Sequence, residues 1–109
     1  MGYYEIRRHG DSQFMFVLRA GNHQVILSSE AYASKAGALN GIASVRLHGV
    51  APDAFERKLS VRGQPYFVLM ATNGEPIGHS ELYADSAAME NGIRSVISNA
   101  PSLQAKDKG

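Results

Sequence analysis

A short motif that could do chemistry occurs twice in the sequence. Ser29-Glu30-Ala31-Tyr32 is matched by Ser80-Glu81-Leu82-Tyr83, with a hydroxyl, a carboxylate and an aromatic ring at the same spacing. The two glutamates could bind a cationic or hydroxylated ligand, with the two tyrosines as stacking walls. In a structural interpretation, each carboxylate accepts backbone N–H groups in the loop before a helix, and each tyrosine packs beside the helix start. Both interpretations stay open, and the candidate binding residues are Glu30, Tyr32, Glu81 and Tyr83.

The rest of the sequence offers no pattern of catalytic or metal-binding residues. The four histidines form no i,i+4 pair, and no histidine in one half of the chain is matched by a histidine at the equivalent position of the other half. His79-Ser80-Glu81 has the residue types of a hydrolase triad, but consecutive residues on a strand alternate faces and cannot line up. The chain has no cysteine, phosphate loop or dinucleotide fingerprint. We therefore expect no catalytic residue, metal or cofactor, and we expect that the protein is not an enzyme.

The motif belongs to a duplication that covers most of the chain. Sliding the sequence against itself by about 51 positions aligns roughly 45 residues without a gap, with about 18 identities. Phe16-Val17-Leu18 falls on Phe67-Val68-Leu69, and Asn40-Gly41-Ile42 falls on Asn91-Gly92-Ile93. The sequence therefore predicts one domain over residues 1–109, with repeat one at 2–49, repeat two at 53–100 and a disordered tail at 101–109.

Each repeat predicts three strands followed by a helix. The second strand of repeat one alternates, with Phe14, Phe16 and Leu18 on one face, and its counterpart lies at residues 66–71. Asn73-Gly74 is a preferred hairpin turn, whereas His23 replaces this glycine in repeat one, so we expect that turn to shift onto Gly21-Asn22.

Helices are predicted to begin at Ser34 and Asp85, both good N-cap residues. A glycine, Gly41 or Gly92, lies on the apolar face of each helix. Since a glycine inside a helix costs about 1 kcal/mol relative to alanine, we expect each helix to approach the sheet closely there.

The charge and hydropathy of the sequence indicate the cellular compartment of the protein, and they do not identify a binding partner. Eleven basic residues balance ten acidic ones, for a net charge of +1. The longest apolar runs fall far short of the roughly 20 residues that span a bilayer, and residues 1–10 do not resemble a signal peptide. We expect a cytoplasmic protein without a membrane contact.

Several of these pieces together resemble one family. Arg19-Ala20-Gly21-Asn22, Asn40-Gly41-Ile42 and Ser44-Val45 in repeat one, with Ser80-Glu81-x-Tyr83 and Asn99-Ala100-Pro101 in repeat two, resemble the YegP-like family of small bacterial proteins. The resemblance covers about residues 2–101, and it is that of a member with two tandem units.

The resemblance implies an α+β fold and leaves the function unknown. Two β3-α units would form one antiparallel sheet with both helices packed on it, related by a pseudo-two-fold axis, with strands exchanged between units. In single-unit relatives that assembly would be a homodimer, so here we expect a monomer that is an intrachain pseudo-dimer. The family has no established biochemical activity.

Three classes of function remain. We favour a non-catalytic cytosolic interaction or binding module with a protein or peptide partner, because a half-covered antiparallel sheet leaves a face and edges free. The first alternative is a nucleic-acid or nucleotide binder, ranked lower because of the neutral net charge. Its contacts would come from exposed tyrosines (Tyr3, Tyr4, Tyr66) and from Arg7, Arg8, Arg57 and Lys58. A weaker alternative is a small-molecule enzyme with its site between the two units.

Overall fold

The computed structural model describes all residues 1–109, and its elements follow the order that the repeat predicts. Each repeat gives three strands and a helix, and one further strand follows the second helix. The elements are β1 (Tyr3–His9), β2 (Gln13–Arg19), β3 (Val25–Ser29), α1 (Lys35–His48), the 3-10 turn η1 (Pro52–Ala54), β4 (Phe55–Leu59), β5 (Pro65–Met70), β6 (Pro76–His79), α2 (Ser86–Asn99) and β7 (Ala105–Asp107).

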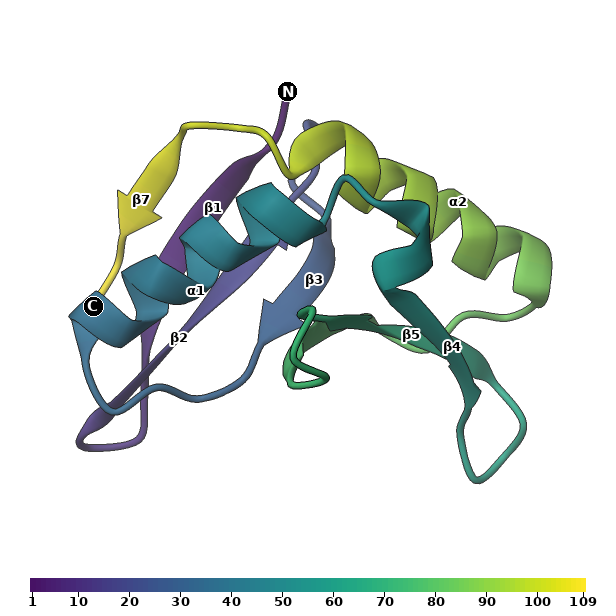
Figure 1. The fold of residues 1–109 in the computed structure, drawn as a ribbon, viewed down its shortest axis with the longest axis horizontal. Coiled ribbons are helices and arrows are strands. Elements are labelled where there is room, and N and C mark those ends of the chain that lie inside the picture. The colour runs from purple at the N-terminus through teal and green to yellow at the C-terminus, as the bar shows by residue number, and fades with distance from the viewer.

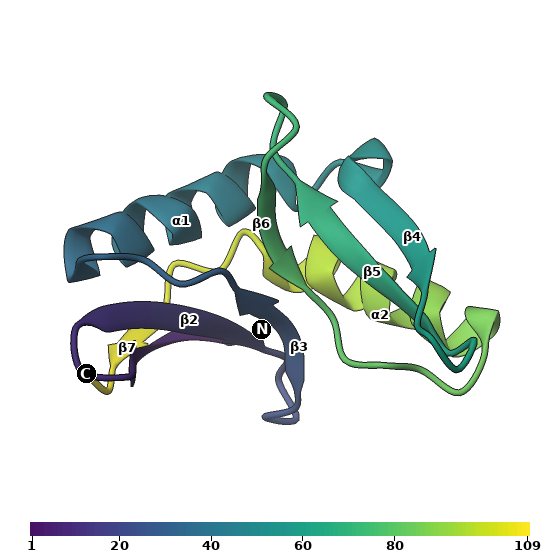
Figure 2. The same ribbon diagram turned by 90° about the horizontal axis from the view of Figure 1, so that it is seen from below.

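All the strands belong to one sheet, in the order β4-β5-β6-β3-β2-β1-β7. Neighbouring strands are antiparallel except β7, which runs parallel to β1, so the sheet is mixed where a purely antiparallel one was expected. Both helices cover the same face of this sheet, which bends between β3 and β6 (Figure 1, Figure 2). Neither helix is long and apolar enough to cross a lipid bilayer.

The junction between the two halves is short and nearly symmetric. Strands β3 and β6 pair only at Ser28–His79 and Ser29–Gly78. Because Ser28 and His79 occupy the same position in the two repeats, the pseudo-two-fold axis passes between them. A feature on one side of this axis therefore has a counterpart on the other.

The chain crosses from one half of the sheet to the other only after each helix. With repeats bounded at 2–49 and 53–100, the three strands of each repeat are neighbours and none of them is exchanged. Strand β4, which follows α1, pairs with β5, and β7, which follows α2, returns across the sheet to pair with β1. Short hairpin connections keep consecutive strands adjacent, so only the chain leaving a helix can cross to the other half.

Our expectation of a disordered tail at 101–109 was wrong. The segment lies along β1, where the Tyr4 N–H donates to the Gln104 carbonyl at 2.9 Å. The Lys35 ammonium in α1 also pairs with the Asp107 carboxylate at 2.9 Å. No residue of β7 is buried, so backbone pairing and charge hold this strand in place. These interactions need no alternation of apolar residues, and the sequence of the strand therefore shows none.

The core lies between the helices and the covered face of the sheet, as the alternation predicts. Phe16, Leu18, Phe67 and Leu69 are fully buried at alternate positions of β2 and β5. The helices contribute the faces expected from the sequence, Ala38, Gly41, Ile42 and Val45 from α1 and Met89, Gly92, Ile93 and Val96 from α2.

Both helix starts are capped as predicted. The Ser34 hydroxyl accepts the Gly37 N–H at 3.0 Å, and the Asp85 carboxylate accepts the Ala88 N–H at 2.8 Å. Each cap satisfies one of the backbone donors that a helix leaves free in its first turn.

The first hairpin turn lies on Gly21-Asn22 as predicted, because the His23 N–H donates to the Ala20 carbonyl at 2.9 Å across these two residues. In the second hairpin the Gly74 N–H donates to the Ala71 carbonyl at 3.0 Å, so the turn lies on Thr72-Asn73, and our prediction of Asn73-Gly74 was wrong. His23 adopts a φ of 71°, in the region that Gly74 occupies with a φ of 85° in the second hairpin. A side chain at positive φ is unfavourable. Two contacts hold His23 there: the Tyr3 hydroxyl lies 2.9 Å from its Nδ1, and Arg19 donates to its carbonyl at 2.8 Å.

Candidate functional site

The serine of each repeated motif fixes the chain where it leaves the sheet. The Ser29 hydroxyl accepts the Phe16 N–H at 2.8 Å and donates to the Glu30 carbonyl at 2.8 Å. The Ser80 hydroxyl makes the same two bonds to Phe67 and Glu81, at 3.0 and 2.8 Å. Both serines are buried, so water cannot reach the backbone groups around them. The serine hydroxyls supply the hydrogen-bond partners that these groups would otherwise lack. This role explains why serine recurs in the motif.

The tyrosine of each motif clamps a helix onto the sheet. The Tyr32 ring stacks on Phe16 with the centroids 6.1 Å apart, and the Tyr83 ring stacks on Phe67 at 6.2 Å. A Cβ added at Gly41 would lie 2.6 Å from the Cζ of Tyr32, so the ring fills the space that this glycine leaves. The same holds for Gly92 and Tyr83. The close approach expected at the helix glycines is therefore to the motif tyrosines.

Burial also changes the acidity of these tyrosines. The pKa values of Tyr32 and Tyr83 are raised above 10.0, mainly because burial disfavours the phenolate. The neighbouring carboxylates, Glu30 and Glu81 respectively, raise them further by repulsion. Both phenols are therefore neutral at physiological pH.

The glutamate of each motif points away from its own unit. Glu30 and Glu81 are exposed, and neither carboxylate accepts a backbone N–H. The two glutamates therefore do not bond to the loop before the helix as our structural interpretation expected. Glu81 makes no ion pair or hydrogen bond through its side chain. The Glu30 carboxylate lies 3.9 Å from Nδ1 of His79, across the axis.

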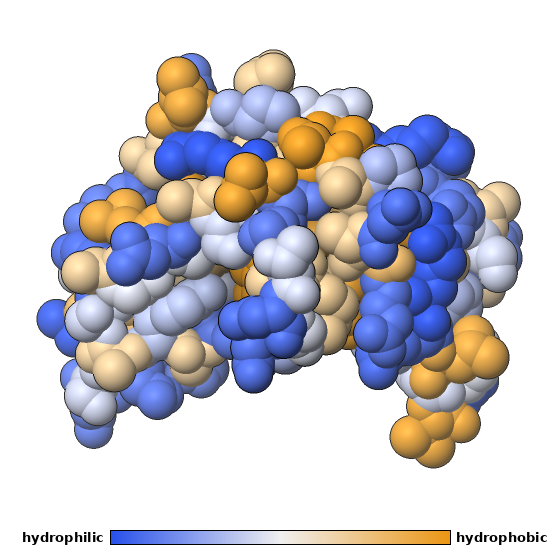
Figure 3. All heavy atoms as spheres, viewed as in Figure 1, coloured by the Kyte–Doolittle hydropathy of each residue, from blue (hydrophilic) through white to orange (hydrophobic).

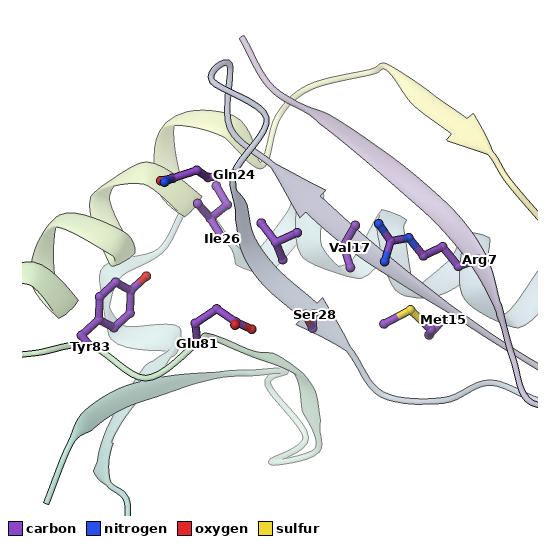
Figure 4. Close-up of a pocket in the computed structure, with 9 residues that line it drawn as sticks. Arg7, Met15, Val17, Gln24, Ile26, Ser28, Glu81 and Tyr83 are labelled. Atoms are coloured by element: carbon purple, nitrogen blue, oxygen red, sulfur yellow. The ribbon is translucent and has the colours of Figure 1, made fainter.

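Glu81 closes a hollow on the first half of the sheet. The hollow of about 530 Å³ lies on the open face, which is the face turned away from the helices. Its floor includes Met15 and Val17, which alternate with the core residues of β2, and Glu81 and Tyr83 reach it from the β6–α2 loop of the other half (Figure 4). The lining residues are Arg7, Met15, Val17, Gln24, Val25, Ile26, Ser28, Glu81 and Tyr83. We call this hollow site A.

Glu30 closes the equivalent hollow on the second half. This hollow of about 430 Å³ lies on the open face of β4, β5 and β6, and its floor includes Tyr66 and Val68, the counterparts of Met15 and Val17. Its lining residues are Glu30, Glu56, Lys58, Tyr66, Val68, Met70, Pro76 and His79. We call it site B. Most of its residues occupy the repeat positions that line site A, so the pseudo-two-fold axis relates the two sites.

The basic residue on each floor is already neutralised. In site A, Arg7 donates to the Glu5 carboxylate at 2.8 Å, and Arg19 lies 3.4 Å from the same oxygen. The hydrogen bond from Arg7, with a smaller contribution from Arg19, lowers the pKa of Glu5 against the opposing effect of burial. In site B, Lys58 pairs with Glu56 at 3.0 Å. The carboxylate that comes from the other unit, Glu81 or Glu30, is therefore a charge in each hollow that no Arg or Lys side chain pairs with.

The four sequence-predicted site residues thus separate into two roles. Glu30 and Glu81 line the hollows, and Tyr83 also lines site A, whereas Tyr32 lines neither hollow. Sequence reasoning missed the floors, above all Val17 and Val68. Their identity at matching positions of the open face was the signal that could have found them.

The aromatic and basic residues considered for nucleic-acid contact are mostly engaged. Tyr4 is fully buried, and its hydroxyl donates to the Ala100 carbonyl at 2.7 Å. The Arg8 guanidinium lies over the Phe14 ring at 5.4 Å, and Arg57 makes two bonds to Glu90 at 2.6 and 2.9 Å. Of the three tyrosines, only Tyr66 lines site A or site B.

Comparison with known proteins shows which family this arrangement represents. The model of a domain of unknown function, DUF1508, matches the chain twice, at residues 10–56 and 60–107. The UPF0339 protein MS1092 of Mannheimia succiniciproducens is 49% identical over 107 residues, which cover 98% of this chain and 95% of that protein. The chain belongs to the UPF0339 (YegP) family. The UPF0339 protein YegP of Escherichia coli O157:H7 is 46% identical over 106 residues, covering 97% of this chain and 96% of that protein.

Solved structures of UPF0339 proteins share the fold. The solution NMR structure of SO3888 from Shewanella oneidensis superimposes with a TM-score of 0.91 at 42% identity, covering 97% of this chain and 90% of that one. That of yegP from E. coli gives a TM-score of 0.92 at 44% identity, covering 98% and 92%. The family is uncharacterised, so membership assigns the fold and no specific activity.

The two DUF1508 matches show where the chain crosses between the halves of the sheet. Each match starts just after the first strand of a repeat and runs through the helix into the strand beyond it, which is β4 in the first match and β7 in the second. β4 pairs with β5 of the second match, and β7 pairs with β1, which precedes the first match.

Proposed function

We propose that this protein is a non-catalytic binding module with two sites, A and B, each for a cationic side chain flanked by an apolar one on a protein or peptide partner. The observation that carries the proposal is the exposed carboxylate of Glu81 or Glu30 above an apolar floor, repeated on both sides of the axis. A Lys or Arg side chain would pair with the carboxylate while its neighbour covers Met15 and Val17 in site A, or Tyr66 and Val68 in site B.

The expected affinity of one site is modest. Both hollows are open, and an exposed ion pair contributes about 0.2–1 kcal/mol, with a few further apolar contacts from the floor. These contributions are small, so we expect a dissociation constant of about 1 mM per site. A partner with two suitably spaced basic segments would bind more tightly, because the second contact becomes intramolecular.

A binding role agrees with how the reactive side chains are used. The hydroxyls of Ser29 and Ser80 are bonded to backbone groups, and the rings of Tyr32 and Tyr83 face helix glycines. Groups that a hydrolase or acid–base enzyme would aim at a substrate are therefore occupied in holding the loops and helices. The enzyme alternative draws no support from sites A and B.

The nucleic-acid alternative draws less support than a peptide partner. A phosphate-binding surface needs unpaired cations, whereas Arg7, Arg57 and Lys58 are each paired with a glutamate. The charge that stays available in both hollows is negative, which repels a phosphate backbone.

Isothermal titration calorimetry with two matched peptides tests the proposal. One peptide carries a lysine between leucines, and in the other a glutamate replaces the lysine. We expect two sites for the lysine peptide, one site each in Glu81→Gln and Glu30→Gln, and none in the double variant. Asp11→Asn, which removes an exposed charge in the β1–β2 turn away from both hollows, is the matched control and keeps two sites. Equal binding of both peptides, or unchanged stoichiometry in the double variant, would refute the proposal.

A further inference from the structure

The two edges of the sheet are not equivalent. One edge is covered, because β7 lies along β1. The other edge, β4, has no strand beyond it (Figure 1). Since β1 and β4 occupy the same place in the two repeats, the protein covers one of two equivalent edges and leaves the other open.

The free backbone groups of β4 can be identified from its neighbour β5. The N–H and carbonyl of Phe67 both bond to Ser80, on the side of β6. In an antiparallel pair, the residue opposite such a position turns its own groups outward, so the N–H and carbonyl of Arg57 point to the open edge. The same alternation directs the groups of Phe55 and Leu59 outward, although the Phe55 N–H already bonds to the Pro52 carbonyl.

The charges along β4 are complementary to those of a second β4 strand that runs antiparallel to it. Glu56 and Lys58 flank Arg57 and project to the open face. If two β4 strands pair about Arg57, Glu56 of each copy lies opposite Lys58 of the other. The Glu56–Lys58 pair within one strand, at 3.0 Å, can then be exchanged for two pairs between strands. The two Arg57 side chains lie on the other face, each neutralised by Glu90.

The backbone register supports the same arrangement. Pairing about Arg57 makes the two Arg57 residues a hydrogen-bonded pair, because the groups of both point outward. The flanking Glu56–Lys58 pairs are then non-hydrogen-bonded positions, where side chains of opposite strands lie closest. In the outer pairs the Leu59 N–H would donate to the Phe55 carbonyl of the second copy, where the Arg57 guanidinium now donates at 3.3 Å.

An exposed apolar group beside the edge adds to this pattern. Leu59 is 69% exposed and Val61 is fully exposed at the β4–β5 turn. Figure 3 shows hydrophobic atoms gathered on this protruding hairpin, at the lower right of the view. Leu59 would lie beside Phe55 of the second copy, which removes part of its apolar surface from water.

We infer that β4 is a self-complementary edge through which two copies of this chain associate, by antiparallel β4–β4 pairing centred on Arg57. The contact is isologous, so it closes as a dimer and does not extend. It involves one five-residue strand from each copy, which places it among weak interfaces, with a dissociation constant of about 1 mM. Each chain stays a complete folded unit at lower concentration.

Charge reversal with rescue tests this inference. The weight-average mass, measured by sedimentation equilibrium over a concentration series, is expected to rise from 11.8 kDa toward twice that value. Lys58→Glu and Glu56→Lys each place like charges opposite one another, and each is expected to weaken self-association about tenfold. An equimolar mixture of the two variants restores both opposite-charge pairs and is expected to associate at least as well as the unchanged chain. Far-ultraviolet circular dichroism verifies that both variants are folded.

Three results would overturn the inference. The first is an unchanged chain that keeps the mass of one copy at millimolar concentration. The second is self-association that neither single variant weakens, which would place the contact elsewhere. The third is a mixture that associates no better than each variant alone, which would show that the charges do not pair across the edge. Amide hydrogen exchange provides the location: protection that depends on concentration is expected at Arg57 and Leu59.

Discussion

Adding one methyl group to helix α1 is expected to have opposite effects at two glycines. At Gly37, in the first turn, an added Cβ would meet its nearest neighbours at 3.4 Å, which is ordinary contact. At Gly41, it would lie 2.6 Å from Cζ of Tyr32 and 2.8 Å from Cε2 of Phe16, closer than van der Waals contact allows. The two positions share the helix and the gain in backbone entropy, and they differ in packing.

The magnitudes determine the sign at each position. Replacing a helix glycine by alanine gains up to about 1 kcal/mol in helix propensity. Overpacking a well-filled core costs about 1–3 kcal/mol, and Phe16 is fully buried and cannot retreat into water. We therefore expect Gly37→Ala to stabilise the protein by about 0.5–1 kcal/mol and Gly41→Ala to destabilise it by about 1–2 kcal/mol.

Gly92→Ala should fall between these two. The atoms nearest its added Cβ all belong to Tyr83, which borders the open hollow of site A and has room to turn aside. We expect a net effect within about 1 kcal/mol of zero.

Urea unfolding followed by circular dichroism measures these differences, with Tyr32→Leu as the second background. If the ring of Tyr32 contributes to the clash, Gly41→Ala should cost less once that ring is absent, with the contact to Phe16 remaining. A stabilising Gly41→Ala, or a cost unchanged in the Tyr32→Leu background, would refute the view that the motif tyrosine clamps the helix.

Two further predictions concern buried hydroxyls. Ser29→Ala and Ser80→Ala each leave a buried N–H and a carbonyl without a partner, so each should cost about 1–3 kcal/mol in urea unfolding, whereas Ser28→Ala, beside the same strand junction, should cost less than about 1 kcal/mol. Equal losses at all three serines would contradict this role. Burial raises the pKa of Tyr4 well above 10.0, so the folded state holds this proton more tightly than the unfolded one, and stability should fall as pH rises above 10.0. Tyr4→Phe should flatten this alkaline loss in melting temperature measured against pH, and an unchanged slope would show that other groups cause it.

The sequence predicted the features that depend on local patterns. The duplication, the buried alternation of Phe16 and Leu18, and the caps at Ser34 and Asp85 all follow from residues close together in the chain. Strand β7 could not be predicted this way. It is three exposed residues long, and it is held by partners in β1 and by Lys35, which lies 72 positions away in the sequence.

The backbone conformation of His23 could not be predicted for a related reason. Its positive φ conflicts with local preference, and the compensating contact comes from Tyr3, a strand away. A rule based on the turn residues alone requires glycine at this position, because it omits this tertiary contact.

The candidate site was predicted in part. The repeated motif identified Glu30 and Glu81, but it gave Tyr32 and Tyr83 as the walls of the site and missed the strand residues that form its floor. The hollows form only because the pseudo-two-fold axis at Ser28 and His79 brings the loop of one unit over the open face of the other. Tyr32 and Gly41 are separated by the same interval as Tyr83 and Gly92, and that repeated spacing was the overlooked sign of a structural clamp.

The most direct test of two equivalent sites is a two-dimensional amide NMR titration of the intact chain with the lysine peptide. We expect shifts in two groups of peaks, around Met15, Val17 and Glu81 for site A and around Tyr66, Val68 and Glu30 for site B. In Glu81→Gln the first group should stop responding while the second continues, and Glu30→Gln should do the reverse. Shifts confined to other parts of the sheet, or none at millimolar peptide, would contradict the central claim.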